Sequence, residues 1–599
     1  MNPRINALRE RINIRLYDSR ARVLRYMGRA NIVVALLTLL SLVYYHGFPI
    51  NDVQSMWVGY IVRGSIAFYL FKFFTELLYN FRPLQFLKDR RWEAALMVFL
   101  IADILTINLL KFELLNKLGH LFSVPGLQDS FILFLQVYFL VIVGLEFGKV
   151  GDFLPKTKLS PPTLLLFSFI LLILMGTGLL MLPEMCPSGQ ASLDFLTALF
   201  TSISASCVTG LSLIDISTAL STKGQIVVLL LMQLGGLNII SFAALFAILR
   251  GGFSIRQQSM VQENMGDSLA NSARLVTGIF RITLLIEGIG MLLLALAWHD
   301  RFNDLGDTLF YSLFHSVSAF NNAGFSLFSN SLATEGLHNS YAVHWILASL
   351  IMLGAIGFGV LQDVSSKNWL KEGISRSWRD MRVSSKLGIT VSFVLLLVGG
   401  TVLYLASPIG EDGKAQVSNA FFQSVSARTA GFNTINFGLL STPALLFMIF
   451  LMFVGGGSGS TAGGIKTSTF SLVFISAWAT IQGKKNINLY HHQIPWELLN
   501  RASAIFLFSA GFIFLGIFIL TIFDPSIALL DLAFEQVSAF CTVGLSTGIT
   551  TDLSLGSKIV IMVSMLIGRV GTLTLAFALS AKRPESNTFK YPKANFTVG

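Results

Sequence analysis

SISASCVTGLS (202–212), SVSAFNNAGFS (316–326), SVSARTAGFN (424–433) and QVSAFCTVGLS (536–546) are four versions of one short segment. Each has a Ser-Ala pair, a few further residues, and then a glycine followed by an apolar side chain. The four glycines stand 114, 107 and 113 residues apart, and this regular long period indicates four copies of one structural unit. Non-helical backbone inside a membrane is tolerated only where protein buries it or where it lines a water-filled path. Four such loops therefore predict a four-part ring around a pore.

The composition places the chain in a lipid bilayer. Of the 599 residues, 53% are hydrophobic and 13% are charged, whereas an average soluble domain carries about 25% charged residues. The first thirty residues hold eight arginines and no long apolar run, so we expect no cleavable signal peptide. The three cysteines, Cys186, Cys207 and Cys541, provide neither a disulfide framework nor a metal-binding spacing.

Twelve apolar runs meet or approach the length of about 20 residues that a membrane-spanning helix needs. Four shorter amphipathic runs come directly before the four glycines. We therefore predict an all-α integral membrane protein with four pseudo-symmetric helix–pore helix–filter loop–helix repeats around a central pore, and four additional N-terminal transmembrane helices. The long runs are 31–47, 57–80, 92–112, 130–148, 163–183, 224–248, 277–298, 342–362, 386–406, 443–480, 500–523 and 556–580, and the short ones are 193–206, 305–320, 415–428 and 526–541.

The same pattern divides the chain into an accessory membrane region, four repeats and a tail. A voltage sensor would need a series of arginines in its fourth span, and 130–148 has none. Packing or regulation is therefore the expected role of the accessory region. The expected divisions are 1–160 for this region, 161–250, 275–365, 384–482 and 498–582 for repeats 1 to 4, and 583–599 for a cytoplasmic C-terminal tail.

Lysines and arginines gather in the connections on one side of the predicted membrane. The connections on the side of the glycine loops hold only Lys223, Arg301 and Lys414. Because cytoplasmic loops carry an excess of Lys and Arg, we expect a multi-pass protein of the cytoplasmic (inner) membrane with both termini in the cytoplasm and the glycine loops open to the outside. This topology also accounts for the net charge of +11, so no nucleic-acid partner is expected. The basic connections are 249–276, 364–386, 481–499 and 581–599.

The glycine loops have the composition of an ion-selective filter. Such filters replace the hydration shell of an ion with backbone carbonyls, and glycine lets the backbone take the positive φ that this requires. Each loop keeps one of the two glycines of a Thr-Val-Gly-Tyr-Gly channel loop, which predicts a shorter filter, and the third copy is one residue shorter than the others. An ordinary helix end is the alternative for any single loop. The residues expected to bind K⁺ through their carbonyls are Cys207, Val208, Thr209, Gly210, Asn321, Asn322, Ala323, Gly324, Thr429, Ala430, Gly431, Phe432, Cys541, Thr542, Val543 and Gly544.

Glycines also interrupt the apolar run 443–480. Each glycine disfavours a helix by roughly 1 kcal/mol relative to Ala, and six fall within ten positions. The run should therefore break within the membrane, where the loop would face the ion path and act as a movable gate. The alternatives are close helix packing and a phosphate-binding loop at 459–467, in which Ile465 interrupts the motif. The expected gate residues are Gly455, Gly456, Gly457, Ser458, Gly459, Ser460, Thr461, Ala462, Gly463 and Gly464, together with Arg569.

Four of the charged residues within or beside the apolar runs of the repeats are candidates for a role. Arg569 is expected to contact the gate and to set a positive barrier below the filter; an arginine that reaches the cytoplasmic interface is the alternative. Glu287 is a further candidate within a long span. Glu535, in the fourth pore helix, could either attract cations or hydrogen-bond to its neighbours. Lys466 is expected to be an anchor on the cytoplasmic side.

The chain resembles the Trk/Ktr/HKT superfamily of potassium transporters, and most closely the bacterial TrkH/KtrB pore-forming subunits, over about residues 160–599. The resemblance implies a pseudo-fourfold pore in each subunit, a homodimer, an intramembrane gating loop, and a cytoplasmic ring of nucleotide-binding RCK subunits of the TrkA/KtrA type. In some plant relatives a serine at the first filter position accompanies sodium transport, so Gly210 favours potassium. Cys207 and Asn238 depart from the family pattern without removing a carbonyl. The motifs that carry the resemblance are SAFNNAGFS, RTAGFNTIN, GGGSGSTAGGIKTS (455–468), FEQVSAFCTVGLSTGIT (534–550), IGRVGTLTLA (567–576) and the ending YPKANFTVG.

These features together predict potassium uptake across the cytoplasmic membrane, driven by a membrane potential that is worth about 2.3 kcal/mol per charge per 100 mV. The sequence has no zinc-protease helix motif and no serine nucleophile elbow. We therefore expect neither enzyme activity nor an organic cofactor, and coupling to Na⁺ stays open. A sodium or weakly selective cation pathway is the alternative within the same class. A membrane scaffold that senses ions without conducting them is the alternative from another class.

Overall fold

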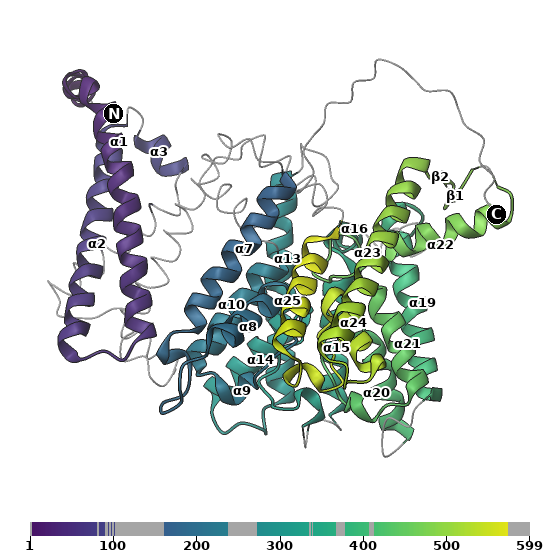
Figure 1. Cartoon of the computed structure of the whole chain (residues 1–599). Coiled ribbons are helices and arrows are strands. Elements are labelled where there is room, and N and C mark those ends of the chain that lie inside the picture. Colours follow the sequence, from purple (N-terminus) through teal and green to yellow (C-terminus); the bar gives the residue numbers. More distant parts are fainter. Residues whose placement is uncertain are drawn as a thin grey trace.

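The computed structural model is built almost entirely of helices (Figure 1). This architecture confirms the all-helical membrane fold predicted from the sequence. The expected spans 92–112 and 130–148 fall almost wholly outside the described residues, as do Asn238 and the tail 583–599. The structure describes residues 3–80, 83–89, 94, 97–98, 101, 161–237, 272–334, 337, 340–366, 378–406, 413–484 and 486–572.

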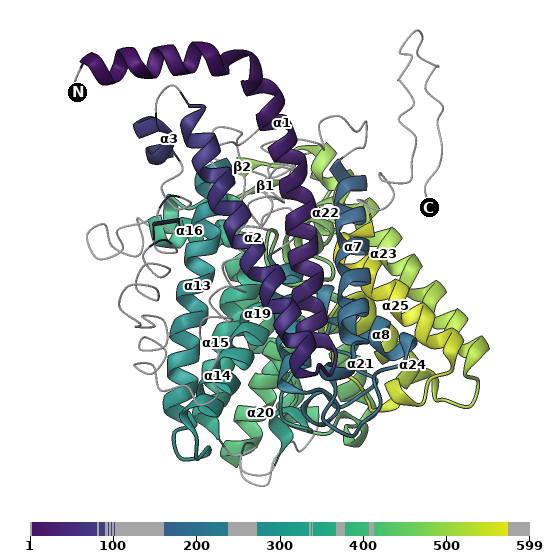
Figure 2. The same cartoon turned by 90° about the vertical axis from the view of Figure 1, so that its left-hand side faces the viewer.

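The N-terminal region forms a pair of long helices, α1 (Pro3–Gly47) and α2 (Asp52–Leu78), followed by the short α3 (Pro83–Asp89). The pair stands beside the main body in Figure 1 and in front of it in Figure 2. A buried hydrogen bond joins the two helices, because the Thr38 hydroxyl donates to the Ser65 hydroxyl at 2.8 Å. Where α1 ends, the side chain of Leu182 from the main body fills the space above Gly47.

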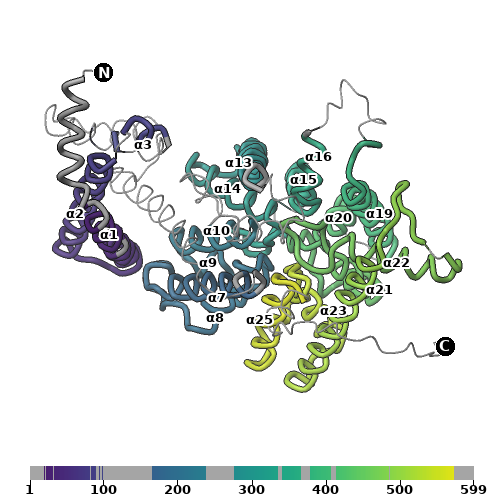
Figure 3. The backbone as a smooth tube through the Cα atoms, turned by 90° about the horizontal axis from the view of Figure 1, so that it is seen from above, coloured from purple at the N-terminus to yellow at the C-terminus, as the bar shows by residue number. Residues whose placement is uncertain are grey.

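The main body consists of four consecutive helical units. Each unit begins with a long helix, continues with a short helix that leads into a glycine loop, and returns through a further helix. Seen from above in Figure 3, the units follow one another around the body, and α25 of the last unit lies beside α8 of the first. Unit 1 has α7 (Pro161–Leu180), α8 (Phe195–Ser206) and α10 (Thr222–Gly236); unit 2 has α13 (Ser272–Ala297), α14 (Leu305–Phe320), α15 (Tyr341–Ile356) and α16 (Phe358–Ser366); unit 3 has α19 (Val383–Ala406), α20 (Gly413–Ser426), α21 (Thr442–Phe453) and α22 (Thr467–Ile481); unit 4 has α23 (Trp496–Phe523), α24 (Leu529–Phe540) and α25 (Leu555–Val570).

Smaller elements complete the units. Between units 3 and 4, the strands β1 (Asn488–Leu489) and β2 (His492–Gln493) form a short antiparallel hairpin. The chain bends by 100° between α15 and α16, and Gly357 at the bend has a φ of +105° that a residue with a side chain rarely adopts. The remaining short helices are η3 (Pro183–Met185), α9 (Ile216–Ala219), η5 (Ser331–Ala333), η6 (Phe437–Leu439) and η7 (Ile549–Thr551).

Several helices are suited to a bilayer by length and composition. Within the described residues, Arg22–Gly47 of α1, Val276–Ala297 of α13, α19 and α23 are long and apolar enough to cross a membrane, and the bent pair α15–α16 is a fifth candidate. The run 443–480 is divided into the shorter apolar helices α21 and α22. The chain is therefore a multi-pass membrane protein.

One contact repeats between the first helix and the short helix of the units. The Ser202 hydroxyl donates to the Ile173 carbonyl at 2.7 Å, and Ser316 donates to the Glu287 carbonyl at the same distance. Each of these serines lies against a glycine, Gly176 or Gly290, where a Cβ would overlap the hydroxyl or nearly so. Ser424 and Gly399 repeat the arrangement in unit 3, and Gln536 takes the place of the serine in unit 4, against Gly516. Small residues thus let the short helices approach the long ones closely.

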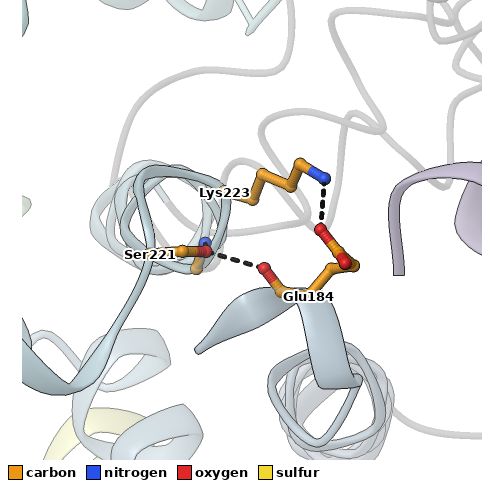
Figure 4. Close-up of polar contacts among 4 residues, drawn as sticks. Glu184, Ser221 and Lys223 are labelled. Atoms are coloured by element: carbon orange, nitrogen blue, oxygen red, sulfur yellow. Dashed lines mark hydrogen bonds and ion pairs between the residues drawn. The ribbon is translucent and has the colours of Figure 1, made fainter. Parts of the chain in front are cut away.

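Polar contacts fix the connection in unit 1 that contains η3 (Figure 4). The Ser221 hydroxyl donates to the Glu184 carbonyl at 2.7 Å, and Lys223 Nζ donates to the Glu184 carboxylate at 2.9 Å. These bonds join η3 to the beginning of α10. They hold the entrance to the third helix of the unit next to the end of its first helix.

Candidate ion pathway

The backbone of every glycine loop is left-handed at two positions, two residues apart. The glycines have φ between +71° and +95°, and the residue two positions earlier also has a positive φ in all four loops. A glycine adopts this conformation easily, whereas valine, asparagine or threonine does so only where the surrounding structure enforces it. The left-handed pairs are Val208 and Gly210, Asn322 and Gly324, Thr429 and Gly431, and Thr542 and Gly544.

The four loops form a closed ring. A Cβ built on Gly210 would lie 2.6 Å from the Ala323 carbonyl oxygen of unit 2, and one on Gly324 would lie 2.9 Å from the Ala430 oxygen of unit 3. In the same way, Gly431 faces the Val543 oxygen of unit 4, and Gly544 faces the Thr209 oxygen of unit 1. Each glycine therefore faces the carbonyl before the glycine of the next unit, and the fourth unit returns to the first. A side chain at any of these positions would collide with a neighbouring backbone.

The serine of each Ser-Ala pair forms hydrogen bonds with the backbone of the glycine loop that follows it. Thr209 N–H donates to the Ser204 carbonyl at 2.8 Å, and Gly210 N–H donates to the Ser204 hydroxyl at 3.1 Å. Because the N–H and C=O of a trans peptide point in opposite directions, these bonds turn the Val208 and Thr209 carbonyls away from the short helix and toward the ring. Ser538 repeats both bonds in unit 4. Ser318 and Ser426 accept loop N–H groups at their carbonyls, and their hydroxyls donate to the carbonyl after the glycine. These serines belonged to the repeated sequence pattern, but no role was predicted for them.

A second set of polar side chains holds the chain just beyond the glycines. His315 Nε2 lies 3.0 Å from the Ser326 hydroxyl in unit 2, and Gln423 Nε2 donates to the Thr434 hydroxyl at 3.1 Å in unit 3. In unit 4, the buried Glu535 carboxylate accepts the hydroxyls of Ser546 and Thr550. Of the two roles considered for Glu535, the geometry favours hydrogen bonding to its neighbours.

The third loop is one residue shorter than the others between its Ser-Ala pair and its glycine. Its left-handed pair aligns Arg428, Thr429, Ala430 and Gly431 with Cys207–Gly210, so Phe432 lies one position beyond the glycine. α20 ends at Ser426, one residue earlier relative to the glycine than the other short helices. Arg428 was not among the predicted site residues, although RTAGF places it as the one charged residue between a Ser-Ala pair and its glycine in the four loops. Its side chain is almost fully buried, with 1% exposed.

The glycine-rich segment leaves the helix at the predicted place. α21 ends at Phe453 and α22 begins at Thr467. Between them, Gly455 N–H donates to the Ile465 carbonyl at 2.9 Å, and Thr467 N–H donates to the Gly456 carbonyl at 3.0 Å. We call these paired ends, 454–456 and 465–467, the neck, and the residues 457–464 between them the tip.

The tip is held by units 2 and 4. Gly457 N–H donates to the Ala355 carbonyl at 2.7 Å, and the Thr461 hydroxyl donates to the Phe320 carbonyl at 3.0 Å. A Cβ on Gly463 would overlap the hydroxyl of Thr542, which belongs to the fourth loop of the ring. The tip therefore lies directly against the ring. Because α21 precedes it and its N–H groups at Gly457 and Thr461 are already bonded, this geometry does not favour a phosphate-binding loop.

Arg569 joins the tip to unit 1. Its Nη1 donates to the Thr461 carbonyl, and its Nη2 donates to the carbonyls of Gly235 and Gly236 at 2.6 and 3.0 Å. All three partners are main-chain carbonyls, one in the tip and two at the end of α10. Lys466, expected to be an anchor, donates to the Ala462 carbonyl of the tip.

Glu287 belongs to a buried polar cluster behind the second loop. Gln233 Nε2 donates to its carboxylate at 3.1 Å, and Asn321 Nδ2 donates to its other oxygen at 3.0 Å. Asn321 Nδ2 also donates to the Gln233 side-chain oxygen at 2.7 Å. Asn321 occupies the position of Arg428 in its own loop, so polar groups fix the end of the short helix in unit 2.

The groups available to bind an ion in this region are backbone carbonyl oxygens. In the part of the chain that the structure describes, no group of three His, Cys, Asp or Glu side chains is arranged to hold a metal ion. Carbonyls directed into a closed ring are instead suited to alkali cations, which bind oxygen ligands while crossing a membrane. The fold and this ring define a membrane protein of the ion-transport class.

The chain belongs to the TrkH family of cation transport proteins. The family model described as "Cation transport protein" matches residues 165–591. The chain is 37% identical over 452 residues to the Ktr system potassium uptake protein B of Vibrio alginolyticus, covering 74% of this chain and 96% of the relative. It is 34% identical over 457 residues to the potassium/sodium uptake protein NtpJ of Enterococcus hirae, covering 74% of this chain and 98% of the relative.

A solved structure shares the fold. The crystal structure of the potassium transporter TrkH from Vibrio parahaemolyticus matches with a TM-score of 0.57 and 21% sequence identity. The match covers 81% of this chain and 97% of that chain. These comparisons confirm the superfamily resemblance identified from the motifs, and with it a non-enzymatic transport family.

Proposed function

We propose that this chain is the pore-forming subunit of a potassium uptake system, and that K⁺ crosses the ring of glycine loops. The observation that carries the proposal is the closed ring itself, in which each glycine faces a carbonyl of the next unit. The hydrogen bonds to the short helices keep the loop N–H groups on the outside of the ring, which leaves carbonyls to replace the hydration shell of the ion. The names of two relatives, a potassium uptake protein and a potassium/sodium uptake protein, support the choice of cation.

The segment 455–464 is proposed to be the gate of this path. Its tip lies against the ring, and Arg569 bonds the tip to unit 1 across the path. In this arrangement the guanidinium both holds the gate closed and places a positive charge where the cation would pass. Opening requires the tip to leave Ala355, Phe320 and Arg569.

The orientation and partners complete the proposal. The chain would lie in the inner membrane. The excess of Lys and Arg on the side opposite the glycine loops favours a cytoplasmic location for that side and for both termini. A homodimer and a cytoplasmic, nucleotide-binding regulatory subunit of the RCK type follow from the resemblance of the motifs. Two relatives are each named as protein B of a "Ktr system", and a system with lettered proteins has further components, which supports such a partner.

Two experiments test the proposal. The first is rescue of growth, at low external K⁺, of a bacterium that lacks its own potassium uptake systems. The second is cation flux into liposomes that contain the purified chain, with K⁺ and Na⁺ compared. Rescue together with faster K⁺ than Na⁺ flux is expected. Equal K⁺ and Na⁺ permeability would replace the potassium assignment with the weakly selective alternative, for which the name of NtpJ provides the specific support.

The same liposomes test whether the chain conducts at all. Gly431→Ser should obstruct the ring, and deletion of 456–463 should remove the gate. If neither change alters the flux, the loops have no part in conduction and the non-conducting scaffold remains.

A further inference from the structure

Arg428 is a buried cation at the junction of the ring and the gate. It directly precedes Thr429, the first left-handed residue of the third loop. The equivalent positions of the other loops hold the uncharged Cys207, Asn321 and Cys541. A buried charge is costly unless hydrogen bonds compensate it, so the contacts of this guanidinium decide what it does.

The guanidinium bonds two separate elements. Nη2 donates to the Ser392 hydroxyl of α19 at 2.9 Å and to the Gly455 carbonyl at 3.2 Å, and Nη1 donates to the Ser392 carbonyl at 3.3 Å. No carboxylate among the described residues forms an ion pair with it. Gly455 lies two residues beyond the end of α21, where the helix dipole favours a positive charge. The fork of Arg428 therefore ties the neck of the glycine-rich segment to α19 and to the third loop.

The neck and the tip of the segment are held by different units. The neck is closed by its own hydrogen bonds and is tied by Arg428, which belongs to unit 3. The tip is bonded to Ala355 and Phe320 of unit 2 and to Arg569 of unit 4. The tip can leave its partners while the neck keeps all of its own. The neck is therefore the part of the segment about which the tip would pivot if it left units 2 and 4.

We propose that Arg428 is the positioning residue of this pivot, and that it couples the third loop of the ring to the gate. The inference rests on the proposed role of 455–464 as the gate. While Arg428 holds Gly455, the tip is aimed at Arg569 and at the ring, and the path is closed. Without this tie the neck shifts, the tip no longer meets its partners, and the closed state loses stability relative to the open one.

The test is basal K⁺ flux through the full-length chain in liposomes, with no regulatory subunit added. Arg428→Gln, which loses the charge and the fork, is expected to raise basal flux about tenfold, equivalent to about 1.4 kcal/mol in the equilibrium between closed and open states. Arg428→Lys keeps the charge but cannot bond both elements at once, and should raise flux less. Arg501→Gln, on the exposed face of α23, is the matched control and should leave flux unchanged.

Each variant is also measured in a chain that lacks 456–463. There Arg428→Gln should have no further effect on flux, because the part of the gate that it positions is gone. If the deletion alone leaves flux at the wild-type level, the gate proposal itself fails. If the deletion raises flux but Arg428→Gln does not, the inference about Arg428 is overturned. An equal fold-change, or an equal loss of preference for K⁺ over Na⁺, in both backgrounds also overturns it, since Arg428 would then act on the ring directly.

Ser392→Ala provides a second variant in case Arg428→Gln does not fold. It keeps the guanidinium and the Gly455 contact but removes the hydroxyl that accepts from Nη2 at 2.9 Å. Flux should rise in the same direction as in Arg428→Gln but by less, and deletion of 456–463 should abolish the difference. Unchanged flux in this variant, with a deletion that does raise flux, would again contradict the proposal.

Discussion

Replacement of Gly210 by alanine tests the ring at one defined point. Gly210 has a φ of +95°, and its missing Cβ would lie 2.6 Å from the Ala323 carbonyl oxygen and 3.1 Å from the Cα of Gly324. Alanine in left-handed backbone costs roughly 1–2 kcal/mol. To reach the ordinary contact distance of 3.4 Å, the methyl group or the carbonyl must also move by about 0.8 Å. Because Ala323 O belongs to the ring, this second effect falls on the ion path.

Gly189→Ala separates the two effects. Gly189 has a φ of +91°, close to that of Gly210, but nothing lies within 4 Å of its Cβ position. Both variants should lose about 1–2 kcal/mol of stability, seen as a similar fall in melting temperature in detergent. Only Gly210→Ala should lose K⁺ flux in liposomes, or preference for K⁺ over Na⁺, and by about tenfold if the shift removes about 1.4 kcal/mol of ion coordination.

Two results would contradict this reasoning. If Gly210→Ala transports K⁺ at the wild-type rate and with the wild-type preference, the carbonyls that face Gly210 do not coordinate the ion. If Gly189→Ala loses as much flux as Gly210→Ala, backbone strain alone explains the loss, and the contact between units has no specific role.

Further predictions concern the gate, the helix packing and the connection in unit 1 that contains η3. Arg569→Gln loses charge-assisted hydrogen bonds to three carbonyls, so basal liposome flux should rise by about tenfold or more; a fall in flux would indicate that the arginine assists transport. Gly516→Ala should lower the melting temperature, because its Cβ would overlap the side-chain amide of Gln536 in α24. Gly511→Ala meets nothing within 4 Å and should stabilise α23 by about 1 kcal/mol. Equal shifts in melting temperature in both variants would contradict the packing argument. Lys223→Gln removes a partly exposed ion pair with Glu184 and should cost at most about 1 kcal/mol in unfolding measurements, with flux unchanged; a large loss of flux would show that the pair does more than fix the connection.

The four-unit architecture was predictable because membrane folding leaves few choices. A long apolar run must be a helix, since an unpaired backbone group in lipid costs several kcal/mol. The period of the glycines then indicated the number of units. The division of 443–480 into α21 and α22 was also predictable, because six glycines in ten positions cannot sustain a helix.

The parts that were not predictable depend on contacts between distant residues. Positive φ was expected at the glycines, but nothing local predicts it at Val208 or Asn322, whose side chains disfavour it. That conformation is imposed by hydrogen bonds from the loop N–H groups to Ser204 and Ser318, and by the neighbouring units. Likewise, the bonds of Arg569 to Gly235 and Gly236 cross more than three hundred residues of sequence. A short segment of sequence around Arg569 reveals the arginine but not partners that are so distant in the chain.

The loop of unit 3 departs from the pattern that the other three loops share. The third loop is one residue shorter between its Ser-Ala pair and its glycine, and the position that holds Cys207, Asn321 and Cys541 elsewhere, three residues before the glycine, holds Arg428 in unit 3. A buried guanidinium needs acceptors, and the broken helix of the same unit leaves Gly455 O free to accept. The Arg428 guanidinium and the Gly455 carbonyl therefore provide each other with a hydrogen-bond partner. An uncharged residue at 428 would leave the Gly455 carbonyl without this partner.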